Sequence, residues 1–167
     1  MNALRKAERK VQEDQKHQLR VMNIVCFLSL HRMGMDADTI IKRFNEATAI
    51  WVECREKKVS AFQILEEETG IELALDGEKS YKEFDQLKWR TETLTPTQYI
   101  YSINRRKRWV SPLILACMCL ALHRAGDDRI EEFLQKTDEQ RRQTEDLKVL
   151  IPMMEQETGY TPRLWGE

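Results

Sequence analysis

The chain reads Leu-Ser-Leu-His-Arg-Met-Gly over residues 28–34 and Leu-Ala-Leu-His-Arg-Ala-Gly over residues 120–126, at an offset of 92 positions. Beyond these stretches a three-residue deletion changes the offset to 89, and further identities follow. They pair Ile41, Phe44, Glu66, Glu68, Thr69 and Gly70 with Ile130, Phe133, Glu155, Glu157, Thr158 and Gly159. One unit therefore occurs twice in this sequence.

Each unit consists of an apolar helix ending in Leu-His-Arg-x-Gly, a second helix carrying Ile and Phe, and a short helix ending in Glu-x-Glu-Thr-Gly. Two copies are too few for a solenoid, which needs three or more repeats. We therefore expect an all-α fold in which two tandem three-helix units pack on each other as a pseudo-symmetric pair.

The ends of the helices can be predicted from capping residues. Gly34 and Gly126 follow apolar runs whose last turns contain His and Arg, which suits a left-handed residue beyond a helix C-terminus. We expect Asp36 to cap the next helix in the first unit, and Asp127 or Asp128 to do so in the second.

The remaining helix signals follow the same chemistry. In the second helix an apolar face is expected from Ile40, Ile41, Phe44, Ala47 and Trp51, which recur at three- and four-residue steps. Ser60 is expected to cap a third helix that ends at Gly70. Proline suits the first helical position, so Ser111-Pro112 is expected to start the second unit and Pro152 to open its short helix.

The expected organisation has five parts. A basic N-terminal helical arm spans 1–20, helical unit 1 spans 21–70, a basic aromatic connector spans 71–111, helical unit 2 spans 112–159 and a tail spans 160–167. Because residues 3–33 contain neither Gly nor Pro, the arm is expected to run continuously into the first apolar helix. Short helices are expected over 79–90 and 98–104, although alternation over 99–103 also fits a β-strand.

Composition excludes several classes of protein. The 167 residues are 41% hydrophobic and 33% charged, with 6 Gly and 4 Pro, which excludes collagen-like and disordered chains. The longest apolar run, 113–122, is about half of the ~20 residues that cross a bilayer, so we expect neither a spanning helix nor membrane binding. With no apolar signal segment after residue 1, a cytoplasmic location is expected.

Charge is distributed unevenly although the formal total is only -1. Residues 1–20 contain six Lys or Arg against three Asp or Glu, and residues 86–110 contain six against one. Residues 21–85 contain eight against thirteen, and residues 127–159 contain five against ten. Either the basic segments lie across the acidic units and neutralise them, or the basic surface is kept for an anionic partner.

The connector carries the candidate binding residues. Cationic side chains neutralise phosphates and aromatic rings stack on unpaired bases, a mixture typical of single-strand binders. Contact with nucleic acid, contact with an acidic protein surface and a structural role all remain open for this segment. The candidates are Lys88, Trp89, Arg90, Tyr99, Tyr101, Arg105, Arg106, Lys107, Arg108 and Trp109.

Enzymatic chemistry is not expected. His31 and His123 lie at helix ends, and neither is accompanied in both copies by a carboxylate or nucleophile. Cys119 and His123 share a helical face, but the first copy has Phe27 in place of the cysteine, so no repeated metal site results. Repeated carboxylates occur in Glu66-Glu67-Glu68 and Glu155-Gln156-Glu157, but neighbouring residues on one helix point apart, so they are not expected to bind a metal together. We therefore predict no catalytic residue, no metal and no cofactor.

Two further patterns have simple structural interpretations. The spacing of Leu30, Gly34 and Ile40 resembles a helix-turn-helix, but the second copy loses three residues after Gly126, so packing around a glycine turn is favoured. The cysteines lie in apolar or helical runs, which predicts buried free thiols in a reducing compartment. They are Cys26, Cys54, Cys117 and Cys119.

The repeated Leu-His-Arg-x-Gly, Ile-x-x-Phe and Glu-Thr-Gly motifs resemble units of small helical proteins encoded by phages and prophages of Gram-positive bacteria. The resemblance covers about 100 residues and implies a phage accessory protein, a class that includes anti-CRISPR and other anti-defence inhibitors. The expected partner is a host protein or nucleoprotein complex, with DNA or RNA contact through the connector. The alternative is a nucleic-acid-binding protein of phage replication or regulation, and self-association into a homodimer would cover any apolar face left open.

Overall fold

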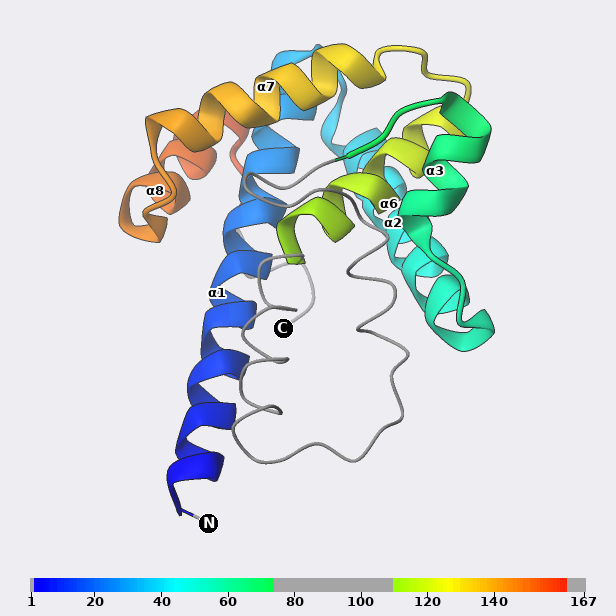
Figure 1. The fold of residues 1–167 in the computed structure, drawn as a ribbon. Helices are drawn as coiled ribbons and strands as arrows, with labels where there is room; N and C mark the ends of the chain where they lie inside the picture. Colours follow the sequence, from blue (N-terminus) through cyan, green and yellow to red (C-terminus); the bar gives the residue numbers. More distant parts are fainter. Residues whose placement is uncertain (1, 74–109, 162–167) are drawn as a thin grey trace.

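The computed structural model describes residues 2–73 and 110–161, and within these ranges it contains six α-helices and no strand (Figure 1). The helices are α1 (Asn2–Arg32), α2 (Ala37–Lys57), α3 (Ala61–Thr69), α6 (Val110–Arg124), α7 (Ile130–Gln143) and α8 (Leu147–Thr158). The prediction of an all-α protein is confirmed for this part of the chain. The elements expected over 79–90 and 98–104 lie outside the described residues.

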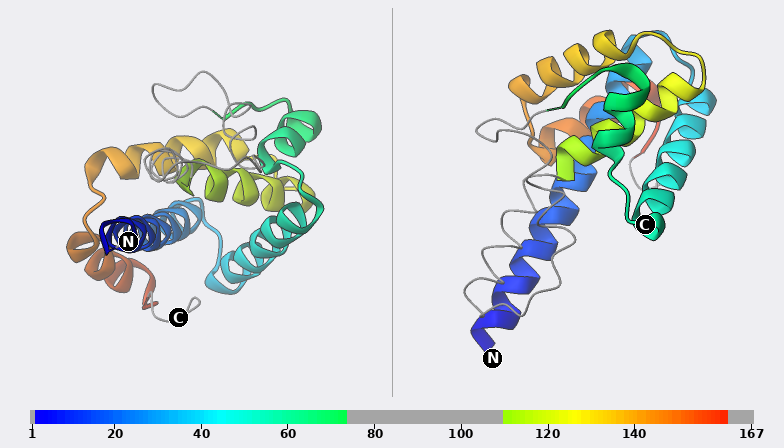
Figure 2. Two further views of the ribbon diagram at one scale, coloured as in Figure 1. Left: turned by 60° about the horizontal axis from the view of Figure 1, so that its bottom comes forward. Right: turned by 45° about the vertical axis from the view of Figure 1, so that its right-hand side comes forward.

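Helix α1 is continuous over 31 residues, as the absence of Gly and Pro predicted. Its C-terminal part lies among the other helices, where residues 24–30 are all buried. Its N-terminal part extends beyond the other described helices, as Figure 1 and the right-hand view of Figure 2 show. None of the described helices is long and apolar enough to cross a membrane.

The two glycine turns have the same geometry. Gly34 and Gly126 have φ values of +91° and +80°, in the left-handed region that glycine adopts without a steric penalty. The amide of each glycine donates to the carbonyl oxygen three residues earlier, and the next amide donates to the carbonyl five residues earlier. These are the two hydrogen bonds of a Schellman motif, so α1 and α6 end in the way that the sequence predicted.

The substitution Gly126→Ala is expected to lower the free energy of unfolding by about 1 kcal/mol, because an L-residue is strained at this φ. A Cβ atom added at Gly126 would meet no atom within 4 Å, so the loss comes from the backbone alone. Lys58 supplies the control, because it is a non-glycine residue that already has a left-handed φ of +54°. The substitution Lys58→Gly removes this backbone strain, so it should not lower the free energy of unfolding. Urea titration measures both, and an unchanged Gly126→Ala variant would contradict the prediction.

The core is formed across the two halves of the chain. Helix α6 packs against α2 and α3, whereas α1 packs against α7, α8 and α6. The apolar segments 24–30 and 116–122 are buried on every side, as expected for central helices. Each central helix thus contacts the second and third helices of the opposite half (Figure 1).

Reciprocal ion pairs join the halves. Arg32 donates to both carboxylate oxygens of Glu157 at 2.9 and 3.1 Å, and Arg124 donates to both oxygens of Glu68 at 2.8 and 3.3 Å. The two arginines come from the two Leu-His-Arg motifs, and the two glutamates come from the two Glu-Thr-Gly motifs. The bond to Arg124 holds the pKa of Glu68 below its usual value.

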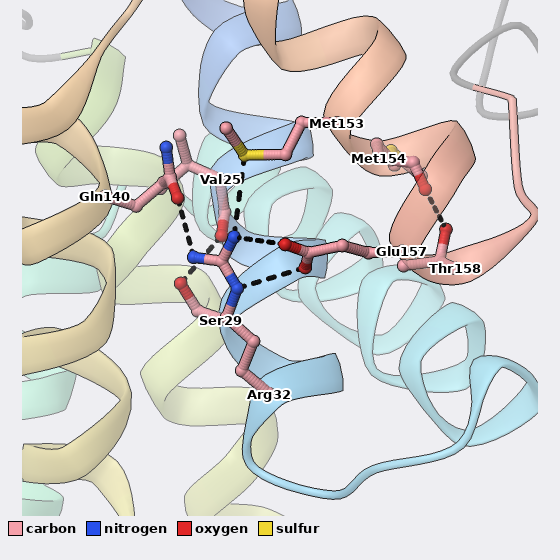
Figure 3. Close-up of polar contacts among 8 residues, drawn as sticks. All are labelled: Val25, Ser29, Arg32, Gln140, Met153, Met154, Glu157 and Thr158. Carbon is pink, nitrogen blue, oxygen red and sulfur yellow. Dashed lines mark hydrogen bonds and ion pairs between the residues drawn. The ribbon is translucent and has the colours of Figure 1, made fainter.

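Arg32 has an additional role between α7 and α8 (Figure 3). Its Nη1 donates to Oε1 of Gln140 at 2.6 Å, and Gln140 is only 1% exposed. The Nε2 atom of Gln140 is buried and has no hydrogen-bond partner among the residues that the structure describes. The guanidinium of Arg32 therefore supplies the hydrogen bond that this buried amide makes through its oxygen.

The predicted apolar face of the second helix is wrong at one position. Trp51 is 38% exposed, and the buried residues of α2 are Ile40, Ala47, Ile50 and Cys54. The inward line thus continues through positions 50 and 54, and Trp51 lies about 100° further round the helix. Asp36 and Ser60 cap α2 and α3 as expected.

Three expected helix starts require correction. Helix α7 begins at Ile130 with Arg129 as its N-cap, because Asp127 instead binds the backbone and guanidinium of Arg129. Helix α6 begins at Val110, so Ser111-Pro112 lies within its first turn. Pro152 lies inside α8 rather than opening it. Because proline has no N–H group, it cannot donate to the carbonyl oxygen of Lys148 four residues earlier, and Lys148 is exposed.

Candidate interaction surface

The connector candidates lie in a part of the chain that the structure does not describe. Residues 88–109, which contain every cation and aromatic residue singled out above for binding, fall outside the described residues. The expectation that they contact nucleic acid or an acidic surface therefore stays a prediction.

Both repeated histidines occupy the last turns of their helices, as predicted. His31 is half-buried and His123 is exposed. Within residues 2–73 and 110–161, no group of three or more His, Cys, Asp or Glu side chains is arranged to hold a metal ion.

The four cysteines are free and buried, which confirms the prediction of buried thiols. Burial raises the pKa of Cys26, and the neighbouring Cys119 raises it further. Burial likewise raises the pKa of Cys119 to about 12. Because the thiolate is the reactive species, both side chains are shielded from electrophiles in the folded protein.

Cys26 and Cys119 are expected to resist alkylation by N-ethylmaleimide at pH 8 until the protein unfolds, because neither is exposed or ionised in the core. Peptide mass spectrometry of samples alkylated with and without urea measures the reaction at each site. Rapid labelling of either cysteine in the native protein would contradict the prediction.

The strongest charge feature in the described residues lies on the N-terminal part of α1. Residues 2–20 contain six Lys or Arg, and all six are exposed. Of the three acidic residues, Glu8 and Asp14 lie on the half-buried side, and only Glu13 accompanies the cations. We call this surface the α1 cationic face, which comprises Arg5, Lys6, Arg9, Lys10, Lys16 and Arg20.

The opposite side of α1 is the less exposed one, because Val11 is buried and Ala7, Gln15 and Gln18 are half-buried. Arg5, Arg9 and Lys16 are exposed on the side of α1 away from these residues. An anion in solution can therefore reach their side chains.

The sequence analysis recognised a basic arm but not this division between its two sides. The signal is the helical period: Arg5, Arg9, Lys16 and Arg20 recur at steps of four, seven and four residues. Such steps keep side chains on one side of a helix. Applied to residues 2–20, this period separates the six cations from the side that contains Val11 and Gln18.

Three large apolar side chains are exposed in the C-terminal part of α2 and just beyond it. Trp51, Val52 and Val59 are each more than one-third exposed. The guanidinium carbon of Arg55 lies 5.5 Å from the centre of the Trp51 ring, within the range of a cation–π contact. Trp and Arg together are typical of the residues that dominate protein–protein binding energy.

Comparison with models of protein families, with curated proteins and with solved structures finds no match to this chain.

Proposed function

We propose that this chain is a non-enzymatic accessory protein of the phage type, which binds and inhibits or modulates a host protein or nucleoprotein complex in the cytoplasm. The observation that supports the proposal is the α1 cationic face, on a helix that extends beyond the other described helices. The resemblance of the repeated motifs to phage-encoded helical proteins adds the biological class, including anti-CRISPR and other anti-defence proteins.

The charges of residues 21–73 and 110–161 suit a target that contains both protein and nucleic acid. Residues 21–73 contain six Lys or Arg against nine Asp or Glu, and residues 110–161 contain six against ten. An acidic body favours the basic protein surface of a nucleoprotein, and the α1 cationic face favours its nucleic acid or an acidic patch. Two surfaces of opposite sign can therefore engage one complex.

The fold proposed for this function is a duplicated unit whose first helices are exchanged. Residues 21–70 and 112–159 would be the two copies, joined by a basic connector. The matched glycine turns support this proposal, and so do the reciprocal Arg–Glu pairs between the halves. Such an arrangement fixes α1 rigidly to the opposite half and thereby orients its N-terminal part.

The test is capture of a partner from lysate of a Gram-positive host with the full-length tagged protein. The variant Arg9→Gln/Lys16→Gln removes two charges from the α1 cationic face, and Lys42→Gln/Lys148→Gln removes two exposed charges from the acidic body. A partner retained by the wild type and by the second variant, but lost by the first, would support the proposal. Equal capture by both variants, or no partner at all, would contradict it.

The alternative is a nucleic-acid-binding protein of phage replication or regulation that uses the connector. It is favoured by the composition of residues 86–110, which contain six cations, one acidic residue and four aromatic residues. The variant Arg106→Gln/Lys107→Gln should then abolish the binding of single strands, whereas Arg9→Gln/Lys16→Gln should not.

A further inference from the structure

The cations of the α1 cationic face are arranged in two flanks. At 3.6 residues per turn they span about 140° of the helix circumference. One flank contains Arg5, Arg9, Lys16 and Arg20, and the other contains Lys6 and Lys10. From residue 5 to residue 20 the face is about 22 Å long at 1.5 Å per residue. It is thus a two-edged cationic strip on a single straight element.

The shape of this strip matches the major groove of duplex DNA. The groove is about 12 Å wide and admits one α-helix, whose diameter with side chains is about 10–12 Å. Cations on both edges of an inserted helix reach the phosphates of the two strands that border the groove. Glu13 lies between the two edges, where a carboxylate can accept a hydrogen bond from a cytosine amino group instead of facing a phosphate.

The rest of the molecule directs DNA to this site. About 200° of the circumference of α1 over residues 2–20 carries exposed side chains, enough for one side of the helix to enter a groove. The acidic excess of residues 21–73 and 110–161 repels phosphates from the body of the protein. Contact is therefore confined to the part of α1 that extends beyond the other described helices.

We propose that the α1 cationic face binds duplex DNA, with the N-terminal part of α1 lying in the major groove and its two cationic edges on the phosphates of opposite strands. This inference rests on the proposed function, of which it names the nucleic-acid component. An acidic protein surface as the partner of this face is the competing outcome of the test.

The test uses the full-length protein and a fluorescent 20-base-pair DNA duplex, titrated between 50 and 300 mM salt. Each neutralised phosphate contributes about 0.9 to the slope of log K against log salt concentration. Arg9→Gln/Lys16→Gln should reduce that slope by about 2 and weaken binding roughly 50-fold at 0.1 M salt. The matched control Lys42→Gln/Lys148→Gln should bind within about twofold of the wild type, because these charges lie outside the α1 cationic face.

The groove is tested by a duplex RNA of the same sequence, whose deep, narrow major groove does not admit a helix. Binding to the RNA should be at least about tenfold weaker, and dimethyl sulfate should show protection of guanine N7 in the DNA. Equal affinity for RNA, equal loss in test and control variants, or no binding of duplex at 50 mM salt would overturn the inference.

Polyaspartate as competitor separates this inference from the proposed function. If it displaces duplex DNA at equal charge concentration, the face is a general anion binder and the groove assignment is wrong. A lysate partner that depends on Arg9 and Lys16 and survives nuclease treatment would then still support the proposed function. A partner lost on nuclease treatment, together with selective duplex binding, supports both.

Discussion

Replacing Phe27 by Ala is expected to lower the free energy of unfolding by about 3–5 kcal/mol, the range for a fully buried aromatic residue. Phe27 is completely buried in α1, with its ring centre 6.5 Å from that of Phe44 in α2 and 5.6 Å from that of Tyr160 beyond α8. Loss of this ring removes a contact shared by both halves of the chain. Urea unfolding followed by far-ultraviolet circular dichroism measures the effect.

Leu19→Ala is the control on the same helix, because Leu19 is 44% exposed and its truncation should change stability by less than about 1 kcal/mol. If Phe27→Ala does not fold, Phe27→Leu keeps the prediction measurable, with a loss of roughly 1–2 kcal/mol expected. A loss for Phe27→Ala no larger than that of Leu19→Ala would show that Phe27 does not fill a shared core.

The two arginines of the repeated motif are expected to contribute unequally to stability. Arg32→Met should lower the free energy of unfolding by about 2–3 kcal/mol, because it leaves the buried amide of Gln140 with neither of its polar atoms paired. Arg124→Met removes only the partly exposed pair with Glu68, for which we expect a loss of at most about 1 kcal/mol. Each variant supplies the control for the other in parallel urea titrations.

A second substitution tests the cause of that difference. Gln140→Leu removes the buried polar group, so the double variant Arg32→Met/Gln140→Leu should recover much of the stability lost by Arg32→Met. Equal losses in the two single variants, or a double variant as unstable as Arg32→Met, would show that the amide is not the source of the effect.

Capping chemistry was predictable from the sequence because it is local. Asp36, Ser60 and the two left-handed glycines act on backbone groups within a few residues, and the structure has them in the expected places. The start of α7 was not predictable in this way. Arg129 binds Asp127 beside it and also donates to the carbonyl oxygen of Met33 at 2.9 Å, a partner 96 residues away that local reasoning cannot supply.

The contacts between the halves show a similar limit. Periodicity identified the buried segments of α1 and α6, since a helix with apolar residues on all sides has to be central. It could not identify which helices surround them, and the exposed position of Trp51 depends on how α2 is rotated against α6. For the α1 cationic face, composition revealed the excess of positive charge over residues 1–20. The separation of the cations from the less exposed side of α1 became visible only when the residues were placed on a helix.

The reciprocal contacts of α1 and α6 determine when the protein can fold during its synthesis. Arg32 has its partners 108 and 125 residues later in the chain, so synthesis has to pass residue 157 before α1 can be enclosed. The apolar residues 24–30 remain without their final neighbours throughout that interval. Because contacts between residues far apart in sequence form slowly, we expect the enclosure of α1 to be a late step of folding.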